Sequence, residues 1–149
     1  MSKDFDQLKL ENQLCFPLYA ASRLVIREYQ PYLDELKITY PQYLVLMVLW
    51  ESNGIAVNDI AQKLILNTNT VTPLLKRMEK MGLLERKRQK EDERKVIISL
   101  TPAGQEMRLA AAEIPLKLGE RLSCGSIQLE ELKRLKQDLH LLINQLTEE

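Results

Sequence analysis

The sequence is poor in the residue types that bind metals, hold cofactors or form the disulfides that stabilise small folds. Its 149 residues include two cysteines and one histidine. There is no CxxC pair, no glycine-rich nucleotide loop and no pair of carboxylates spaced for acid–base chemistry. His140, the single histidine, has too few candidate ligands for a metal site. We therefore expect no metal, no cofactor and no catalytic residue.

The sequence also lacks a long apolar segment. Its longest apolar run, Tyr43 to Trp50, is far too short to span a bilayer. The first residues, MSKDFDQLKLEN, have no apolar core of the kind found in signal peptides. We expect one cytoplasmic domain over residues 1–149. In a reducing compartment, Cys15 and Cys124 are not expected to form a permanent structural disulfide.

Charge is balanced over the whole chain but not along it. The chain has 21 basic and 21 acidic side chains, so its net charge says nothing about nucleic acid. Between Lys76 and Lys95, however, nine basic residues accompany five acidic ones, which leaves an excess of +4 there and −4 elsewhere. A local basic excess is what contact with phosphates requires. A solvated helix and hairpin would have the same composition, so charge alone does not decide.

A short helix is predicted directly before the basic segment. Its apolar residues, Ile60, Ala61 and Leu64, have helical spacing. Asn58 or Asp59 is placed to cap its start, because a short polar side chain can accept the free N–H groups of a first turn.

A second helix follows after a polar turn at residues 67–70, which also supplies its N-cap. Pro73 lies early enough to be tolerated, and Gly82 is placed to end the helix in the left-handed conformation. Residues at helical spacing form its buried stripe: Val71, Leu74, Leu75 and Met78. Residues off that stripe are candidate contacts to bases and phosphates: Thr68, Asn69, Thr70, Thr72, Lys76 and Arg77.

Two strand-length runs, 83–88 and 96–100, then predict a charged β-hairpin joined by residues 89–95. Arg94, near the hairpin tip, is suited to a narrow minor groove. The other basic candidates on the hairpin are Arg86, Lys87, Arg88 and Lys95. Helix, polar turn, helix, glycine stop and basic hairpin, in this order, predict a winged helix-turn-helix over 55–101 that binds double-stranded DNA.

Helices are predicted on both sides of this lobe, so the expected fold class is mainly α with a small β-hairpin wing (α+β). The first helix runs from about residue 8, with Asn12 as a candidate N-cap, and Pro31 is expected to end it. Thr39 and Gln42 form a capping-box pattern for a second, buried helix, which Gly54 is placed to end.

After the wing, Thr101 and Pro102 are an N-cap and first residue for a helix that Pro115 and Gly119 weaken. A break at 123–126 precedes a final helix with a long apolar stripe: Leu129, Leu132, Leu135, Leu139, Leu142, Ile143 and Leu146. An intrachain bundle would use such a stripe. A protein that places two recognition helices one DNA turn apart must be a dimer, and we predict a homodimer on a pseudo-palindromic operator, built from helices within 8–31 and 102–149.

Cys15 lies near the start of the first predicted helix, at its third position if Asn12 is the cap. Free N–H groups and the positive end of the helix dipole favour the thiolate there, and the thiolate is the nucleophile toward a peroxide O–O bond. Its oxidation gives a sulfenic acid, which another thiol converts to a disulfide. A lone helical cysteine more often acts as a small buried hydrophobe, and the residues alone leave both roles open.

The segment LNTNTVTPLLKRMEKMGLLERKRQKEDERKVIISLTPAG and the order of the elements resemble the MarR family of bacterial repressors over nearly the whole chain. The segments QLCFPLYAA, REYQPYL and ITYPQYLVL resemble its branch that senses organic hydroperoxides. This resemblance implies that Cys15 is the peroxide-reactive thiol and that Tyr29 and Tyr40 hydrogen-bond its sulfur across the dimer. It also implies that Asp92 orients Arg94 for the minor groove.

The resemblance extends to two-cysteine members of the branch, in which a partner's cysteine resolves the oxidised thiol. Cys124 is the candidate for that role, and a small cellular thiol is the alternative. The predicted function is a dimeric repressor that releases its operator when organic hydroperoxide oxidises Cys15. One alternative is a MarR-type repressor released by a phenolic ligand, with Cys15 structural. A more distant alternative is a thiol peroxidase, which would leave the DNA-binding module unexplained, so no enzyme is expected.

Overall fold

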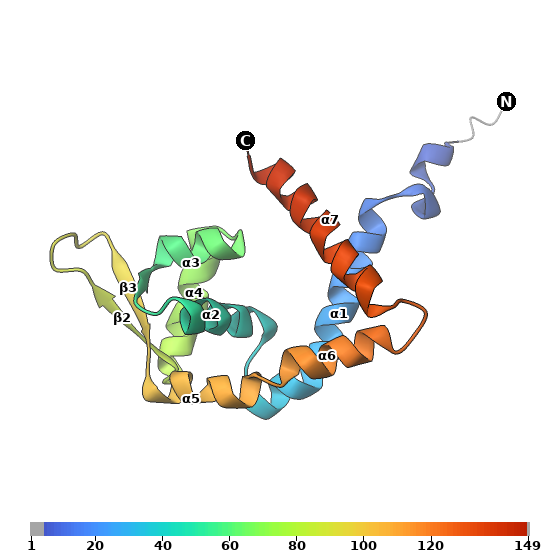
Figure 1. Ribbon diagram of the computed structural model, residues 1–149. Coiled ribbons are helices and arrows are strands. Elements are labelled where there is room, and N and C mark those ends of the chain that lie inside the picture. Colours follow the sequence, from blue (N-terminus) through green and yellow to red (C-terminus); the bar gives the residue numbers. More distant parts are fainter. Residues whose placement is uncertain (1–4, 149) are drawn as a thin grey trace. The chain divides into compact units, whose positions relative to one another are not determined.

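In the computed structural model, which describes residues 5–148, the chain is mainly helical with a small antiparallel sheet, as predicted (Figure 1). It divides into two compact units, one ending at Ala111 and the other beginning at Ala112. The ends of the predicted domain, 1–149, fall outside the described residues. Among the described helices, none combines the length and apolar character needed to cross a membrane.

Helix α1 spans Cys15–Leu36 and begins later than expected. Two short 3-10 helices precede it, η1 (Asp6–Leu8) and η2 (Leu10–Asn12). Asn12 does not cap α1, because its amide donates to the Asp6 carbonyl at 2.8 Å. Leu14 occupies the cap position without a side-chain hydrogen bond, so Cys15 is the first rather than the third residue of the helix.

The expectation that Pro31 ends this helix was wrong. The helix continues to Leu36, and Lys37 then adopts a left-handed conformation with φ of 56°. A proline inside a helix removes one N–H donor. Leu33, in the turn beyond Pro31, is completely buried. Burial of its side chain opposes that loss, and the Ile38 N–H closes the end by donating to the Leu33 carbonyl at 3.1 Å.

Helix α2 spans Tyr40–Glu51 and has the predicted capping box. The Gln42 side chain accepts from the Thr39 N–H at 2.9 Å, and the Thr39 hydroxyl accepts from the Gln42 N–H at 3.4 Å. Half of the helix is buried, at Gln42, Tyr43, Val45, Leu46, Val48 and Leu49. Gly54 does not end α2, whose C-cap is Ser52. It turns the chain into the sheet with φ of 75°, and its N–H donates to Ile98.

Helices α3 (Val57–Leu64) and α4 (Thr68–Lys80) form the predicted helix-turn-helix. The N-cap of α3 is Ala56, and Asp59 acts from inside the first turn by accepting from the Ala56 N–H at 3.3 Å. Asn67 caps α4 by accepting from the Thr70 N–H at 2.9 Å. The predicted stripe of α4 is buried in full: Val71, Leu74, Leu75 and Met78. Gly82, with φ of 76°, follows the helix in the left-handed conformation, as predicted.

The wing consists of β2 (Leu84–Arg88) and β3 (Val96–Leu100), which pair antiparallel with Leu84 opposite Leu100. A third strand that the sequence did not reveal, β1 (Ile55–Ala56), pairs with the other edge of β3. Two residues are too few for an alternating pattern. The sheet order β1-β3-β2 fixes the base of the wing directly to the start of α3.

Helix α5 (Pro102–Ala111) starts as predicted, because the Thr101 hydroxyl accepts from the Gly104 N–H at 3.2 Å. What we expected to be one weakened helix is two. Pro115 lies in the first turn of α6 (Ile114–Ser123), where a proline costs little. Helix α7 (Leu129–Thr147) has no buried residue, and its predicted apolar stripe is largely uncovered.

Candidate DNA interface and cysteine sensor

The first turn of α4 presents polar side chains to solvent. Thr68, Asn69 and Thr70 are exposed, and Thr72, one turn on, is half-buried. The Thr70 hydroxyl donates to the Asn67 side chain at 3.1 Å, so Asn67 organises this end of the helix through two hydrogen bonds. The first turn of α4 is therefore a capped, polar helix start of the kind that enters a major groove.

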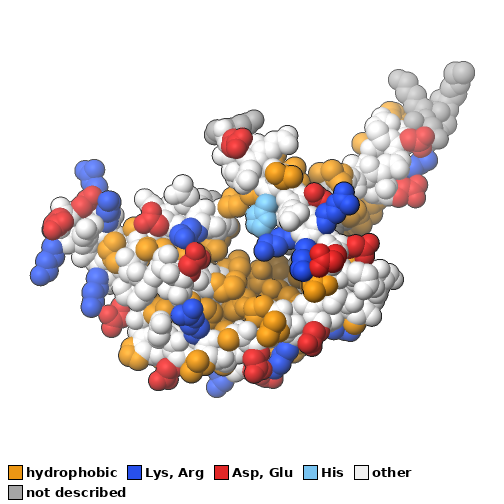
Figure 2. Space-filling model, viewed as in Figure 1, with side chains coloured by type: hydrophobic (Ala, Val, Ile, Leu, Met, Phe, Trp, Pro, Cys, Tyr) orange, Lys and Arg blue, Asp and Glu red, His pale blue; other side chains and the backbone are white. Residues whose placement is uncertain are grey.

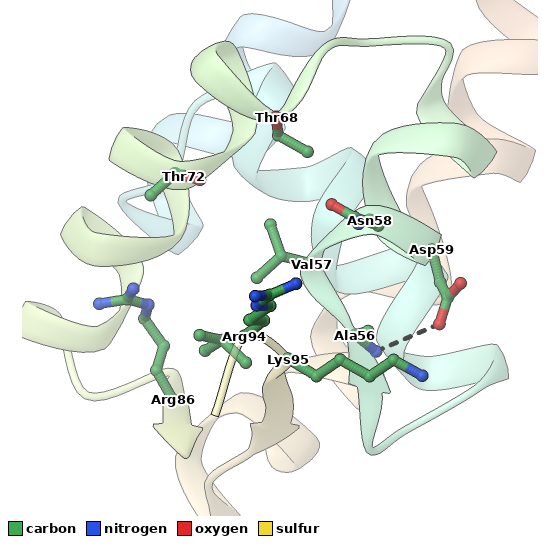
Figure 3. A pocket seen from close by; sticks show the side chains of 10 residues that line it. Ala56, Val57, Asn58, Asp59, Thr68, Thr72, Arg86, Arg94 and Lys95 are labelled. Atoms are coloured by element: carbon green, nitrogen blue, oxygen red, sulfur yellow. Dashed lines mark hydrogen bonds between the residues drawn. The ribbon is translucent and has the colours of Figure 1, made fainter. Parts of the chain in front are cut away.

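A concavity of about 330 Å³ lies between α4, the start of α3 and the wing (Figure 3). Of the predicted DNA contacts, it collects residues from three elements: Thr68, Thr72, Arg86, Arg94 and Lys95. Asn58 and Asp59 line its α3 side and were not among the predicted contacts, because the sequence indicated them only as helix caps. The helix-turn-helix and the wing thus form one continuous surface.

A second hollow, of about 300 Å³, is lined by Lys76, Arg86, Arg88 and Val96. Arg86 borders both hollows and joins the two basic groups. The remaining candidates, Asn69, Thr70, Arg77, Lys87 and Asp92, line neither hollow. Lys87 lies 3.1 Å from the exposed Glu85 carboxylate, with which it forms a surface ion pair.

Glu79 on α4 fixes Arg86 on β2, a relationship the sequence did not reveal. Its carboxylate accepts from the Arg86 backbone N–H at 3.1 Å and lies 3.6 Å from the Arg86 guanidinium. The Nε atom of Arg86 is buried without a hydrogen-bond partner. Glu79 lies near the end of α4, and Arg86 lies in β2, seven residues later. Because a periodic pattern applies within one helix or one strand, it does not predict this contact.

The turn of the wing is built around Asp92. Its side chain accepts from the Arg94 N–H at 3.1 Å, and its carbonyl accepts from the Lys95 N–H at 2.9 Å. The hydrogen bonds hold the backbone of Arg94, which leaves its guanidinium exposed for a partner. Basic and acidic side chains lie side by side on the projecting wing (Figure 2).

Cys15 and Cys124 are both free and exposed. Cys15 is the first residue of α1, whose N-terminal N–H groups are not used by a side-chain cap. Cys124 is the C-cap of α6, where its sulfur donates to the Arg121 carbonyl at 3.0 Å. Both thiols are accessible to reagents in solution.

Tyr29 and Tyr40 pack against each other with ring centroids 4.9 Å apart. Tyr43 joins them at 5.9 Å and 6.3 Å, so three phenols form one cluster between α1 and α2. Burial, followed by the nearby phenols of Tyr40 and Tyr43, raises the pKa of Tyr29 to about 12. Burial likewise raises the pKa of Tyr40. These phenols remain protonated at neutral pH and can donate hydrogen bonds to an anion.

The structure does not bring Cys15 together with these tyrosines inside one chain. Cys15 and Tyr29 are both on α1, fourteen residues apart, which corresponds to roughly 21 Å along the helix axis. Tyr40 packs on Tyr29 and lies with it. A contact between the thiol and the two phenols therefore requires a second copy of the chain.

Known proteins share this architecture. The family model described as "Transcriptional regulator SarA/Rot" matches residues 27–109. The organic hydroperoxide resistance transcriptional regulator of Bacillus subtilis (strain 168) is 49% identical over 146 residues, covering 98% of this chain and 97% of its own.

Two solved structures of AbfR, a protein of Staphylococcus epidermidis, are also similar. Reduced AbfR bound to DNA has 40% identity and a TM-score of 0.76, with 96% of this chain and 98% of that chain covered. The disulfide form has 39% identity and a TM-score of 0.67, with 96% and 95% covered. The chain therefore belongs to the MarR family of winged-helix transcriptional regulators, in the branch of the organic hydroperoxide resistance regulators.

Proposed function

We propose that this protein is a dimeric repressor that binds double-stranded DNA and releases it when an organic hydroperoxide oxidises Cys15. One observation carries the DNA-binding part: Thr68 and Thr72 of α4 and Arg94 of the wing line a single concavity. A recognition helix in the major groove and a wing arginine in the minor groove both need this common face. Reduced AbfR bound to DNA supports the assignment by similarity.

The contacts divide by chemistry. Asn69, Thr70 and Thr72 are the proposed base contacts, because they present short polar groups on the first turns of α4. The basic side chains are the proposed phosphate and minor-groove contacts: Lys76, Arg77, Arg86, Lys87, Arg88, Arg94 and Lys95. The lobe over 55–101 carries both sets.

The dimer is part of the proposal, with helices within 8–31 and 102–149 as its interface. Helix α7 exposes its apolar stripe, including Leu135 at 48% and Leu146 at 68%. On α1, Tyr19 is 63% and Leu24 is 50% exposed. Apolar faces of this length normally lie against a partner. Because operator DNA lies in the bacterial cytoplasm, the proposal places the protein there.

The sensing reaction begins at the Cys15 sulfur. The thiolate attacks the hydroxyl-bearing oxygen of the hydroperoxide and the O–O bond breaks, which gives Cys15 sulfenic acid and an alkoxide. The alkoxide takes up the proton that the Cys15 thiol released and leaves as an alcohol. The partner's Cys124 thiol then displaces water to form an intersubunit disulfide. The phenols of Tyr29 and Tyr40, protonated at neutral pH, are the proposed donors to the Cys15 sulfur across the dimer. The disulfide form of AbfR and the hydroperoxide regulator of Bacillus subtilis support this chemistry.

Release follows if oxidation favours a dimer geometry in which the two recognition helices no longer match the operator. A hundredfold loss of affinity requires about 2.7 kcal/mol of coupling, which is within the usual range between two sites. A new covalent bond between subunits is sufficient to supply it.

Fluorescence anisotropy tests the proposal directly. Wild type and Cys15→Ser are titrated with DNA from upstream of the protein's own gene, with and without equimolar organic hydroperoxide. Release by the wild type alone is expected. Retention of DNA by both proteins would overturn the redox proposal and direct attention to a phenolic ligand as the releasing signal.

The disulfide and the dimer have separate tests. After peroxide treatment, non-reducing electrophoresis should show a dimer-sized band for the wild type and none for Cys124→Ser. A small-thiol adduct on Cys15 in mass spectra of the wild type, without that band, would replace the disulfide step. Analytical ultracentrifugation showing only monomer at micromolar concentration would exclude the dimer.

A further inference from the structure

Trp50, the single tryptophan of the chain, connects two helices at the centre of the first unit. It lies in the last turn of α2, and its indole N–H donates to the Gly104 carbonyl on α5 at 2.9 Å. Trp50 is half-buried, and this bond gives its indole N–H a partner while joining the end of α2 to the first turn of α5.

On one side, Trp50 contacts the tyrosine cluster. Its ring meets Tyr43 edge to face, with centroids 6.4 Å apart and an angle of 68° between the planes. Tyr43 is 2% exposed and packs against both Tyr29 and Tyr40. Four aromatic rings therefore run without interruption from α1 to the end of α2. Tyr43 is buried and the other three rings are half-buried, so the four rings form a continuous line of contacts between α1 and the end of α2.

On the other side, Gly104 is pressed against the segment that joins the recognition helix to the wing. A Cβ atom at Gly104 would fall inside contact distance of the Leu83 carbonyl. That carbonyl also accepts from the Thr101 N–H at 3.1 Å, and the Thr101 hydroxyl donates to the Gly82 carbonyl at 2.6 Å. Gly82 and Leu83 lie directly between α4 and β2. These contacts join the first turn of α5 to the segment between the recognition helix and the wing.

We propose that Trp50 is a positioning residue for redox control: through its bond to Gly104, it couples the arrangement of Tyr29 and Tyr40 to the position of α4 and the wing. The inference rests on the proposed function, in which oxidation of the partner's Cys15 changes what those two phenols contact. Trp50 itself touches neither the thiol nor the DNA.

A purely structural role makes a different prediction. A residue that only stabilises the lobe, when weakened, lowers DNA affinity equally in the reduced and oxidised proteins. A residue that couples two sites changes the ratio of those affinities. The quantity to measure is therefore the ratio of the DNA affinity of the reduced protein to that of the oxidised protein.

The variant is Trp50→Phe, which keeps an aromatic ring beside Tyr43 and removes the N–H donor. We expect its reduced form to bind DNA within about threefold of the wild type, and the reduced-to-oxidised affinity ratio to fall by about tenfold, within the range of coupling between sites. An unchanged ratio would overturn the proposal. Wild type that fails to release DNA with peroxide would instead remove the proposed function, and with it this coupling.

Asn53→Ala is the matched control. Asn53 follows α2, and its side chain accepts from the Leu100 N–H at 2.8 Å, so it holds the end of β3 through a hydrogen bond in which no aromatic ring takes part. Its loss should weaken DNA binding to a similar degree in both redox forms. Equal changes of the reduced-to-oxidised affinity ratio in Asn53→Ala and Trp50→Phe would show that Trp50 has no specific part in the coupling.

A second measurement needs no change at Trp50. Because the chain has one tryptophan, tryptophan emission reports on the surroundings of Trp50 alone, which include its bond to Gly104 and its contact with Tyr43. Equimolar organic hydroperoxide should shift the emission of the wild type in the absence of DNA and leave that of Cys15→Ser unchanged. Identical spectra before and after oxidation of the wild type, with DNA release intact, would overturn the proposal while leaving the proposed function in place.

Discussion

The carboxylate of Glu79 and the backbone N–H of Arg86 are joined at 3.1 Å, and this one hydrogen bond ties the recognition helix to the first strand of the wing. The same carboxylate lies 3.6 Å from the Arg86 guanidinium, which borders both basic hollows. An acidic residue thus lies beside Arg86, one of the proposed phosphate contacts. Its position indicates that Glu79 orients Arg86. The negative charge of Glu79 also reduces the electrostatic attraction between this surface and DNA.

Two substitutions of Glu79 separate these effects. Glu79→Gln keeps an oxygen for the Arg86 N–H but frees the guanidinium, so DNA affinity should equal or exceed that of the wild type. The slope of log affinity against log salt should steepen by about one, as for one more neutralised phosphate. Glu79→Ala also loses the acceptor, and it should bind about fivefold more weakly than Glu79→Gln, or ~1 kcal/mol. Anisotropy titrations over a salt series would check both predictions. Equal DNA affinities of Glu79→Gln and Glu79→Ala would show that the hydrogen bond from the Arg86 N–H to Glu79 does not contribute to DNA binding.

Asp92 gives a prediction whose sign opposes simple electrostatics. On charge alone, removing an acidic side chain from a DNA-facing wing should strengthen DNA binding. Because Asp92 accepts from the Arg94 N–H at 3.1 Å and shapes the turn, Asp92→Ala should instead weaken binding, by about three- to tenfold, through a displaced Arg94.

The neighbours of Asp92 provide the control for this experiment. Glu91→Ala and Glu93→Ala remove the same charge from exposed positions on the same loop. They should raise DNA affinity modestly at low salt, an effect that salt screens. If Asp92→Ala behaved like these two, the turn would have no part in placing Arg94.

The helix-turn-helix and the hairpin could be predicted from the sequence because their signals are local. Asn67 as a cap, the stripe from Val71 to Met78 and Gly82 as a stop each act within a few residues of the structure they determine. Pro31 misled the prediction because its local effect is opposed by the burial of Leu33, which depends on contacts far along the chain. Tertiary packing decides such cases.

The sequence proposed the candidate DNA contacts one residue at a time, but not their arrangement. Five of these candidates line one concavity: Thr68, Thr72, Arg86, Arg94 and Lys95. The pairing of Glu79 with Arg86, the strand β1 and the ring cluster of Tyr29, Tyr40 and Tyr43 join residues from separate elements. No spacing rule within one element contains that information.

The tyrosine cluster predicts how stability depends on alkaline pH. Burial raises the pKa of Tyr29 from 10.0 to about 12, so the folded state holds this proton more tightly than the unfolded state does. Below about pH 10, both states are protonated and the contribution to stability is complete. As pH rises toward 12, the unfolded chain loses its proton first and stability falls. Urea unfolding across this range should show a shallower fall for Tyr29→Phe; identical curves would mean that Tyr29 is not held neutral by folding.

Replacing either of two helical glycines with alanine should change the stability of the protein, but in opposite directions. At Gly104 a methyl group would collide with the Leu83 carbonyl and lie 3.1 Å from the Leu100 side chain, so Gly104→Ala should destabilise the protein by about 1–3 kcal/mol. At Gly119, inside α6, no heavy atom lies within 4 Å of the added carbon. Gly119→Ala should therefore stabilise by about 0.5–1 kcal/mol, through the lower conformational entropy of the unfolded chain. Thermal and urea unfolding of both variants would test the pair. Because Gly104 also receives the Trp50 bond, a mild effect there would mean that α5 can move away from Leu83, and that the wing is not tightly tied to it.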